Sequence, residues 1–126
     1  MILGVTGSRN KPAFRNAEKF YKFLCENIVS ELHHGDCLGW DESCYWICNH
    51  FGITTVAHPP TNDGNRAFTK STTILTPKPY LDRNKDIVNA VEYIIAAPGG
   101  PEKQRSGTWS TVRYAKKVGV KGVVWM

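Results

Sequence analysis

Short apolar segments alternate along the chain with longer stretches in which apolar and polar residues mix. Five apolar segments, most of them rich in Val, Ile or Leu, have the length of buried strands. These segments are residues 2–5, 29–33, 53–57, 93–97 and 122–125. The pattern therefore predicts five strands.

The stretches between the strands carry apolar residues at every third or fourth position, which is the spacing of one helical face. Four helices are expected, beginning near residues 12, 39, 80 and 106. Residues 58–79 show no periodicity and hold four of the seven prolines, so we expect a long loop there. In the first helix, the spacing assigns the buried face to Phe14, Ala17, Tyr21, Leu24 and Ile28.

The alternation of strands and helices predicts the fold class. Nearly continuous apolar strands joined by helical crossovers form a parallel sheet covered by helices on both faces. Right-handed crossovers then favour an α/β, Rossmann-like, doubly wound sheet with strand order 3-2-1-4-5. In that order the loops after strands one and four meet at a topological switch point, where ligands bind outside the carboxyl ends of the strands.

Length and composition narrow the class of protein. The 126 residues fit one domain, which we expect to span residues 1–126. With 41% hydrophobic and 21% charged residues, the chain has the composition of a soluble globular protein. No apolar run approaches the ~20 residues that cross a bilayer, and the chain does not open with a basic and then apolar leader. We therefore expect a cytoplasmic location.

The net charge of +5 favours an anionic partner. The lysines and arginines are scattered, and the closest pair is Lys116 and Lys117. This pattern fits a phosphate-bearing small molecule at least as well as a nucleic-acid backbone.

The four cysteines raise the question of a metal site. Cys37 lies near three histidines in the sequence, His33, His34 and His50, and this cluster invites a zinc interpretation. No CxxC or HxxxH pair accompanies it. Buried thiols are common in a reducing cytosol. We expect core cysteines, no metal and no cofactor, with a metal site as the weaker alternative.

The start of the last helix predicts a phosphate seat. Ser106 is a good N-cap, and Gly107 and Thr108 follow as the first helical residues. Their backbone N–H groups lack intrahelical partners and lie at the positive end of the helix dipole, so they favour an anion. Arg105 precedes them and adds a cation. The alternative is that Ser106 simply caps a helix after a flexible loop.

A second glycine loop follows the first strand. Gly7 permits a tight turn against a ligand, and Thr6, Ser8 and Arg9 surround it with hydroxyls and a guanidinium. The segment is not the GxGxxG fingerprint, so a plain turn is equally consistent with it.

A third loop follows the second strand and contains Gly35, Asp36 and Asp41. Either carboxylate can accept hydrogen bonds from ribose hydroxyls. The alternative is that each stabilises the start of the next helix.

Arg83 and Asn84 fall in the first turns of the third helix. A guanidinium is unfavourable beside the positive end of a helix dipole, so Arg83 points to an anion or carboxylate partner. A surface salt bridge is the alternative. Three aromatic residues, Trp40, Tyr80 and Trp109, flank these loops and are candidates either to stack on a base or to pack in the core.

In order and spacing these motifs resemble the SLOG superfamily of Rossmann-like nucleotide-binding proteins, which includes DNA-processing protein A and the cytokinin-activating phosphoribohydrolases. The resemblance covers almost the whole chain and is greatest to the small stand-alone members of bacteria and phages. It implies that the loop after strand four, with Pro98, Gly99 and Gly100, holds a phosphate together with the helix start. The matching segments are residues 4–9, 34–36, 39–41, 83–84, 98–100 and 106–108.

The chain departs from the phosphoribohydrolase pattern at two points. Those enzymes carry a PGGxGTxxE motif, whose glutamate acts with an upstream arginine on the N-glycosidic bond, and Arg83 falls where that arginine would be. Here residues 101–105 separate Gly100 from Ser106, and Thr111 stands at the glutamate position. A threonine cannot act as a carboxylate acid or base. Glu102, in the inserted segment, is a candidate replacement, and the resemblance implies binding more strongly than hydrolysis.

We therefore expect a protein that binds a nucleotide or nucleotide-derived ligand, such as an ADP-ribose-like or cyclic nucleotide signal, as a sensor or a sequestering protein. The alternative is an N-glycosidase acting on nucleoside 5′-monophosphates, with Arg83 and one of the carboxylates Glu102, Asp36 or Asp41. Single-stranded nucleic-acid binding is a lesser alternative. The family resemblance and the number of aromatic residues also lead us to expect a homo-oligomer.

Overall fold

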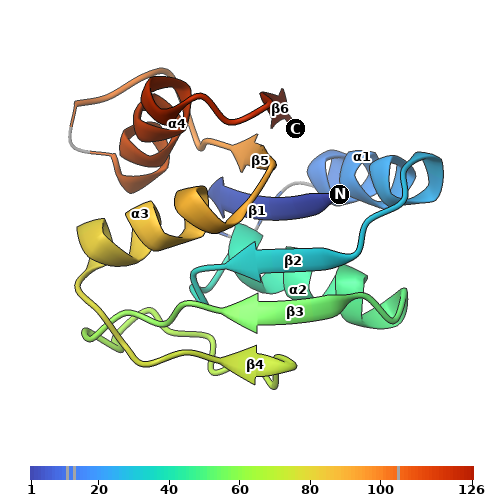
Figure 1. The fold of residues 1–126 in the computed structure, drawn as a ribbon, viewed down its shortest axis with the longest axis horizontal. Coiled ribbons are helices and arrows are strands. Elements are labelled where there is room, and N and C mark those ends of the chain that lie inside the picture. The colour runs from blue at the N-terminus through green and yellow to red at the C-terminus, as the bar shows by residue number, and fades with distance from the viewer. Residues whose placement is uncertain (11, 13, 105) are drawn as a thin grey trace.

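In the computed structural model, the chain forms a six-stranded parallel sheet with helices on both faces (Figure 1). The structure describes residues 1–10, 12, 14–104 and 106–126. The strand order is β4-β3-β2-β1-β5-β6. The strands are β1 Ile2–Gly7, β2 Glu31–His34, β3 Thr54–Ala57, β4 Thr73–Ile74, β5 Tyr93–Ala97 and β6 Gly122–Trp125. The helices are α1 Phe14–Glu26, α2 Trp40–His50, α3 Tyr80–Ala90 and α4 Gly107–Val118.

The five expected strands occur in the expected order, because 3-2-1-4-5 corresponds to β3-β2-β1-β5-β6. The sixth strand, β4, was missed. It has two residues and extends the sheet by pairing with the end of β3, Val56 with Thr73 and Ala57 with Ile74. So short a strand in a proline-rich stretch carries no periodicity by which the sequence could reveal it.

Two hydrophobic cores lie on the two faces of the sheet, and β5 contributes to both. Ile95 and Ala97 pack with residues of α1 and α2, whereas Ile94 and Ala96 pack with residues of α3 and α4. Alternate side chains of a strand point to opposite faces, so this division follows from the apolar run of β5. Cys44 and Cys48 belong to the first core.

The expected buried face of α1 is only partly right. Leu24 is buried as expected, but Phe14 is 82% exposed and Tyr21 is 47% exposed, and the unexpected Phe20 is buried. The helix is oriented by the contact between the Phe20 and Trp40 rings, whose centroids lie 5.8 Å apart in an edge-to-face arrangement. Ile28 lies beyond the helix end and is exposed, so it never belonged to the helical pattern.

The long loop between β3 and α3 is anchored by Asp36. One carboxylate oxygen of Asp36 accepts a hydrogen bond from Arg66 Nε at 2.7 Å, and the other accepts from Thr69 N and Oγ1 at 2.9 and 2.8 Å. Thr69 Oγ1 also bonds Ser71 Oγ, which bonds His34 Nε2, and His34 Nδ1 accepts from Asp36 N. This closed ring of buried polar groups fixes the loop beside β2.

No helix in the described part of the chain is long and apolar enough to cross a membrane. Within residues 1–10, 12, 14–104 and 106–126, no group of three His, Cys, Asp or Glu side chains is placed to hold a metal ion.

Candidate functional site

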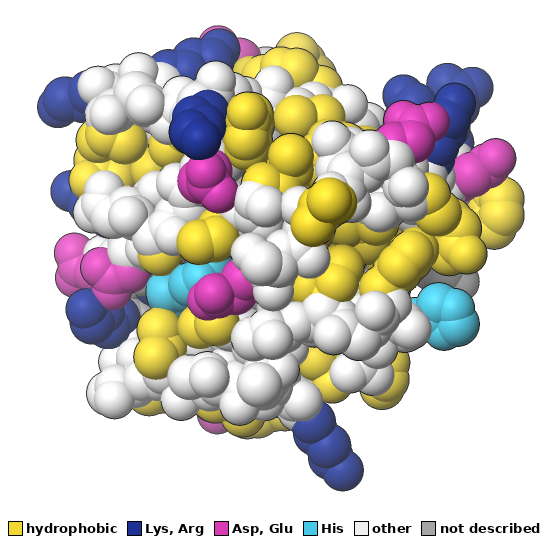
Figure 2. Space-filling view, turned by 45° about the vertical axis from the view of Figure 1, so that its right-hand side comes forward, with side chains coloured by type: hydrophobic (Ala, Val, Ile, Leu, Met, Phe, Trp, Pro, Cys, Tyr) yellow, Lys and Arg dark blue, Asp and Glu magenta, His cyan; other side chains and the backbone are white. Residues whose placement is uncertain are grey.

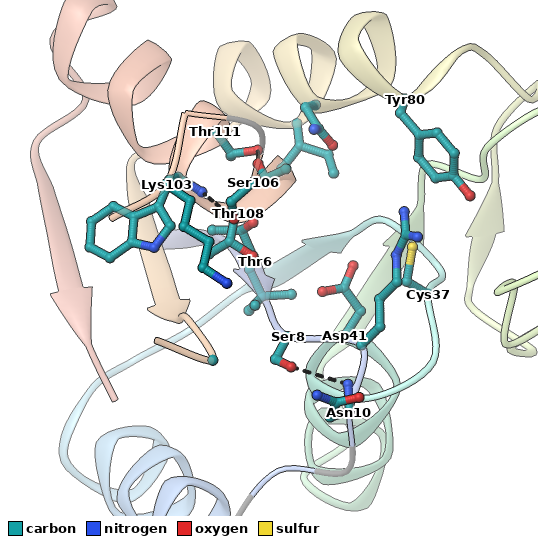
Figure 3. A pocket seen from close by; sticks show the side chains of 18 of the residues that line it. Thr6, Ser8, Asn10, Cys37, Asp41, Tyr80, Lys103, Ser106, Thr108 and Thr111 are labelled. Atoms are coloured by element: carbon teal, nitrogen blue, oxygen red, sulfur yellow. Dashed lines mark hydrogen bonds between the residues drawn. The ribbon is translucent and has the colours of Figure 1, made fainter. Parts of the chain in front are cut away.

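A cavity of about 550 Å³ lies at the carboxyl ends of β1 and β5 (Figure 3). Its walls come from the loop after β1, the first turns of α3, the loop after β5 and the first turn of α4. These segments are far apart in the sequence and meet at the predicted switch point, because β1 and β5 are neighbours in the sheet.

Most of the residues singled out from the sequence line this cavity. They are Thr6, Gly7, Ser8, Arg9, Asp41, Arg83, Asn84, Gly99, Gly100, Ser106, Gly107 and Thr108. Gly35, Asp36, Pro98 and Glu102 are not among the lining residues. Arg105 lies outside the described residues.

The start of α4 contributes backbone donors to the cavity. The Ser106 side chain caps the helix by accepting a hydrogen bond from Trp109 N at 3.4 Å. No described residue accepts a hydrogen bond from the N–H of Gly107 or Thr108. A Cβ added to Gly107 would meet no atom within 4 Å. The positive end of this helix is therefore open on the cavity side.

Gly7 and Gly39 let the loop after β1 approach α2 closely. A Cβ on Gly7 would lie 2.5 Å from the Trp40 ring, so a larger residue cannot occupy this position. Gly39 has φ of 90° and abuts the backbone of Ser8, whose carbonyl accepts from Trp40 N at 3.0 Å. Trp40 itself is fully buried in the core, so it is not a candidate for stacking on a base.

Arg83 is buried in the cavity wall, with 5% of its surface exposed. Its Nη1 donates to the backbone carbonyls of Gly35 and His58, the latter at 3.1 Å, and its Nε donates to Asn84 Oδ1 at 2.8 Å. Cys37 Sγ lies 3.7 Å from Nη2. These partners are two carbonyl groups, one side-chain amide and one buried thiol. They fix the position of the guanidinium, and no described residue forms an ion pair with it.

Two guanidiniums flank the ring of Tyr80. Arg9 Cζ lies 4.8 Å from the ring centroid and Arg83 Cζ lies 5.2 Å from it. Tyr80 Oη donates to the carbonyl of Asn62 at 3.2 Å, which holds the ring in place. The negative ring face stabilises both cations and fixes them at one side of the cavity.

Asp41 is a buried carboxyl group in the same cavity. Its Oδ2 accepts a hydrogen bond from Gly35 N at 2.6 Å. Burial raises its pKa to about 6, although Arg83 and the Gly35 hydrogen bond both favour the charged form. Asp41 is therefore the acid in this cavity that titrates near neutral pH.

Two carboxylates that the sequence offered as candidates do not line the cavity. Asp36 is fully buried, and both of its oxygens are used in anchoring the long loop. Glu102 accepts a hydrogen bond from Arg113 Nη1 at 2.9 Å, on the outer side of α4.

Some lining residues were not recognised from the sequence. Cys37 was considered only as a metal ligand or a core thiol, and Asn10 was overlooked because asparagine is common in turns. Lys103 lies in the segment inserted before α4, and its position after β5 was the one signal that placed it near the switch point. Tyr80 and Trp109, considered for base stacking, do line the cavity.

No protein-family model matches the sequence, and no curated protein matches it. Solved structures match it by fold. A molybdenum cofactor binding protein from Rippkaea orientalis aligns with a TM-score of 0.74 and 21% identity, over 99% of this chain and 76% of that chain. DNA processing protein A from Streptococcus pneumoniae aligns with a TM-score of 0.68 and 18% identity, over 98% of this chain and 49% of that chain.

The chain has a SLOG-type Rossmann-like fold. DNA processing protein A from Helicobacter pylori also aligns, with a TM-score of 0.65 and 17% identity, over 98% of this chain and 64% of that chain. The chain spans about half the length of the Streptococcus pneumoniae protein. At these identities the SLOG-type likeness is one of fold.

Proposed function

We propose that the cavity binds a phosphorylated, nucleotide-type ligand and that the protein acts as a sensor or sequestering protein for it. The observation that carries the proposal is the burial of the Arg83 guanidinium in the wall of the cavity. No carboxylate of the described residues forms an ion pair with it. Asp41, the carboxylate that lines the cavity, is bonded to Gly35 N and not to Arg83, so an anion in the cavity is the partner that could pair with this guanidinium directly.

The start of α4 supports the same class of ligand. Gly107 and Thr108, whose N–H groups have no acceptor among the described residues, line the cavity from the start of α4, whereas Arg83 lines it from α3. Backbone N–H groups at a helix start bind phosphate oxygens, and a guanidinium binds them in pairs. The cavity volume of about 550 Å³ falls within the usual range for small-molecule sites, about 300–1,000 Å³.

Binding without turnover is supported by the position of Thr111. Its Oγ1 donates to the carbonyl of Gly107 at 2.9 Å, so the hydroxyl completes a turn of α4. A hydroxyl engaged in this way supplies neither an acid nor a base at neutral pH.

The distribution of charge favours a small ligand over a nucleic-acid backbone. On the face shown in Figure 2, the Lys and Arg side chains lie in separate groups with neutral and acidic side chains between them. Arg9, Arg83 and Lys103 instead converge on the cavity. One neighbour in fold is named for binding a cofactor and another for binding single-stranded DNA, so both ligand classes belong in the test.

Calorimetric titration with AMP, ADP, ADP-ribose and cyclic AMP tests the proposal, together with mass spectrometry of compounds released by heating the purified protein. We expect at least one of these nucleotides to bind. Arg83→Lys keeps the charge but loses the planar fork, and it should weaken that binding about 10-fold or more. Arg15→Lys, at an exposed position of α1, is the matched control and should bind like the wild type.

The proposal is wrong if no phosphorylated compound is released and no nucleotide titrates. Saturable binding of a single-stranded oligonucleotide with no nucleotide binding would also overturn it. That result would favour the nucleic-acid alternative, and the binding should then weaken steeply with salt.

A second candidate function is N-glycosidic cleavage of nucleoside 5′-monophosphates, because Asp41 places a carboxyl group with a pKa of about 6 in the cavity. The neutral acid would give its proton to the departing base as the N-glycosidic bond breaks, water would add to the sugar carbon, and the Asp41 carboxylate would take up the proton that this water releases. Chromatography of AMP incubated with the protein should then show free adenine, and Asp41→Asn should abolish its release. Absence of adenine with the wild type would exclude AMP hydrolysis.

A further inference from the structure

The loop between β5 and α4 is held back against the helix by Arg113. Arg113 Nη1 donates to Glu102 Oε2 at 2.9 Å and to the carbonyl of Lys103 at 3.4 Å, and Nη2 donates to the carbonyl of Gln104 at 3.1 Å. One guanidinium thus engages three consecutive residues. Because two of the acceptors are backbone carbonyls, the contact fixes the path of the loop and not merely one side chain.

The loop has further fixed points on either side of this contact. Trp109 Nε1 donates to the carbonyl of Gly100 at 3.3 Å, and Ser106 N donates to the carbonyl of Lys103 at 3.5 Å. Lys103 is therefore held from both sides: Trp109, in the first turn of α4, bonds the chain before it, and Ser106, the N-cap, bonds its own carbonyl.

The anchored loop directs the Lys103 side chain into the cavity. Glu102 takes its place on the outer side, against Arg113, whereas Lys103 lines the cavity and extends into it in Figure 3. The ammonium group thus joins Arg9 and Arg83 as a third cation, from the wall that carries the open start of α4. Asp41 is the one carboxylate among the residues that line this cavity.

We propose that Lys103 is an anion-binding residue that determines specificity for ligands with more than one negative charge, and that Arg113 is the residue that positions it. This inference rests on the proposed binding of a phosphorylated ligand. Lys103 and Gly107 both line the cavity, so a ligand with a phosphate seated at Gly107 can present a second negative charge to the Lys103 ammonium.

Inorganic pyrophosphate is the probe, because it tests charge recognition without a base or sugar. Its binding is followed by NMR through the backbone amide of Gly107, at low salt and again at about 0.5 M NaCl. The variants are Lys103→Ala, Arg113→Gln, Arg113→Lys and the double variant Lys103→Ala/Arg113→Gln. Lys117→Gln is the matched control, since it removes one charge from α4 about 15 Å from the helix start.

We expect Lys103→Ala to raise the Kd for pyrophosphate roughly 3- to 10-fold at low salt and much less at high salt. Arg113→Gln should raise it similarly, and the double variant should be no weaker than Lys103→Ala, because Arg113 acts through Lys103. Arg113→Lys retains the charge but lacks the planar fork whose two nitrogens reach Glu102, Lys103 and Gln104, so it should resemble Arg113→Gln. Lys117→Gln should stay within about twofold of the wild type.

Three results would overturn the inference while leaving the proposed function intact. They are wild-type affinity in Lys103→Ala, additive effects in the double variant, and wild-type affinity in Arg113→Lys. If the wild type binds neither pyrophosphate nor any nucleotide, the proposed function is wrong, and this inference is wrong with it. Thermal unfolding of each variant verifies that a changed Kd reflects a folded protein.

Discussion

Asp41 and Arg83 face each other across Gly35 without forming an ion pair. A Cβ on Gly35 would lie 2.5 Å from Arg83 Nη1 and 2.9 Å from Asp41 Oδ2, so the two side chains border the same point from opposite sides. Asp41 is instead bonded to Gly35 N, and Arg83 to the carbonyl of Gly35. The N–H and the carbonyl of Gly35 thus bond both charged groups. The summed charge of Asp41 and Arg83 then depends on the pH, through Asp41, and a bound ligand adds to it.

Anion binding should depend on the protonation of Asp41. Its pKa of about 6 means that the carboxyl group loses its charge as the pH falls through that value. A neutral Asp41 no longer repels an anion beside Arg83, so affinity should rise from pH 7.5 towards pH 5. Cyclic AMP is a suitable probe for calorimetry, because its phosphodiester keeps the same charge throughout this range. Asp41→Asn should bind with nearly constant affinity, and a wild-type affinity that rises with pH would contradict this assignment.

Gly35→Ala should damage both stability and binding. The added methyl group overlaps Arg83 and Asp41, and neither can move without losing a buried hydrogen bond. We expect the free energy of unfolding to fall by about 1–3 kcal/mol and nucleotide affinity to fall with it. Gly64→Ala is the control, because its Cβ would meet only Asn62 Oδ1 at 3.4 Å. Equal urea midpoints for Gly35→Ala and the wild type would show that the space beside Gly35 is not filled as described.

Gly107→Asp should separate stability from binding. A carboxylate in the first turn interacts favourably with the helix dipole, and the structure leaves open space for the new side chain. The variant should therefore be as stable as the wild type or slightly more so, by up to about 1 kcal/mol. It should bind nucleotides at least about 10-fold more weakly, because the negative charge occupies the anion seat. Gly107→Asn, which adds a similar side chain without charge, should lose much less affinity, and equal losses would point to a steric cause.

The protein should lose stability in acid. Burial lowers the pKa of His34 and that of His58 from 6.5 to about 4. Between these values the unfolded chain binds more protons than the folded one, so the histidine contribution to stability is complete above pH 6.5 and is lost as the pH falls towards 4. Asp41, whose pKa is raised, acts in the opposite sense but is a single group against two histidines.

Urea unfolding at several pH values between 4 and 7 measures this dependence. His58→Gln should flatten it, whereas His50→Gln, at an exposed position, should leave it unchanged. A stability that stays constant over the whole range would mean that the two imidazoles are not buried as neutral groups.

The sequence predicted those parts of the fold that periodicity controls. The strand order and the meeting of the loops after β1 and β5 follow from apolar strands and right-handed crossovers, and both were confirmed. The orientation of α1 did not follow, because Phe20 and Tyr21 are both aromatic and the choice between them depends on the distant Trp40.

Individual roles within the site were harder to predict than its location. Asp36 and Asp41 belong to the same short segment, yet one anchors a loop and the other lines the cavity. The difference depends on Arg66 and Thr69, which lie about thirty residues further along the chain. Sequence spacing carries no information about such distant hydrogen bonds, so it identified both carboxylates and could not separate them.

The shared membership of β5 in both cores has a consequence for motion in the native state. Because β5 packs against helices on both faces and pairs with β1 and β6, opening one layer of helices leaves its backbone hydrogen bonds in place. The amides of this strand should therefore exchange with deuterium only when the whole molecule unfolds. The tips of the surrounding loops should exchange sooner. A ligand bound at the carboxyl ends of β1 and β5 would therefore contact slowly exchanging strands on one side and rapidly exchanging loops on the other.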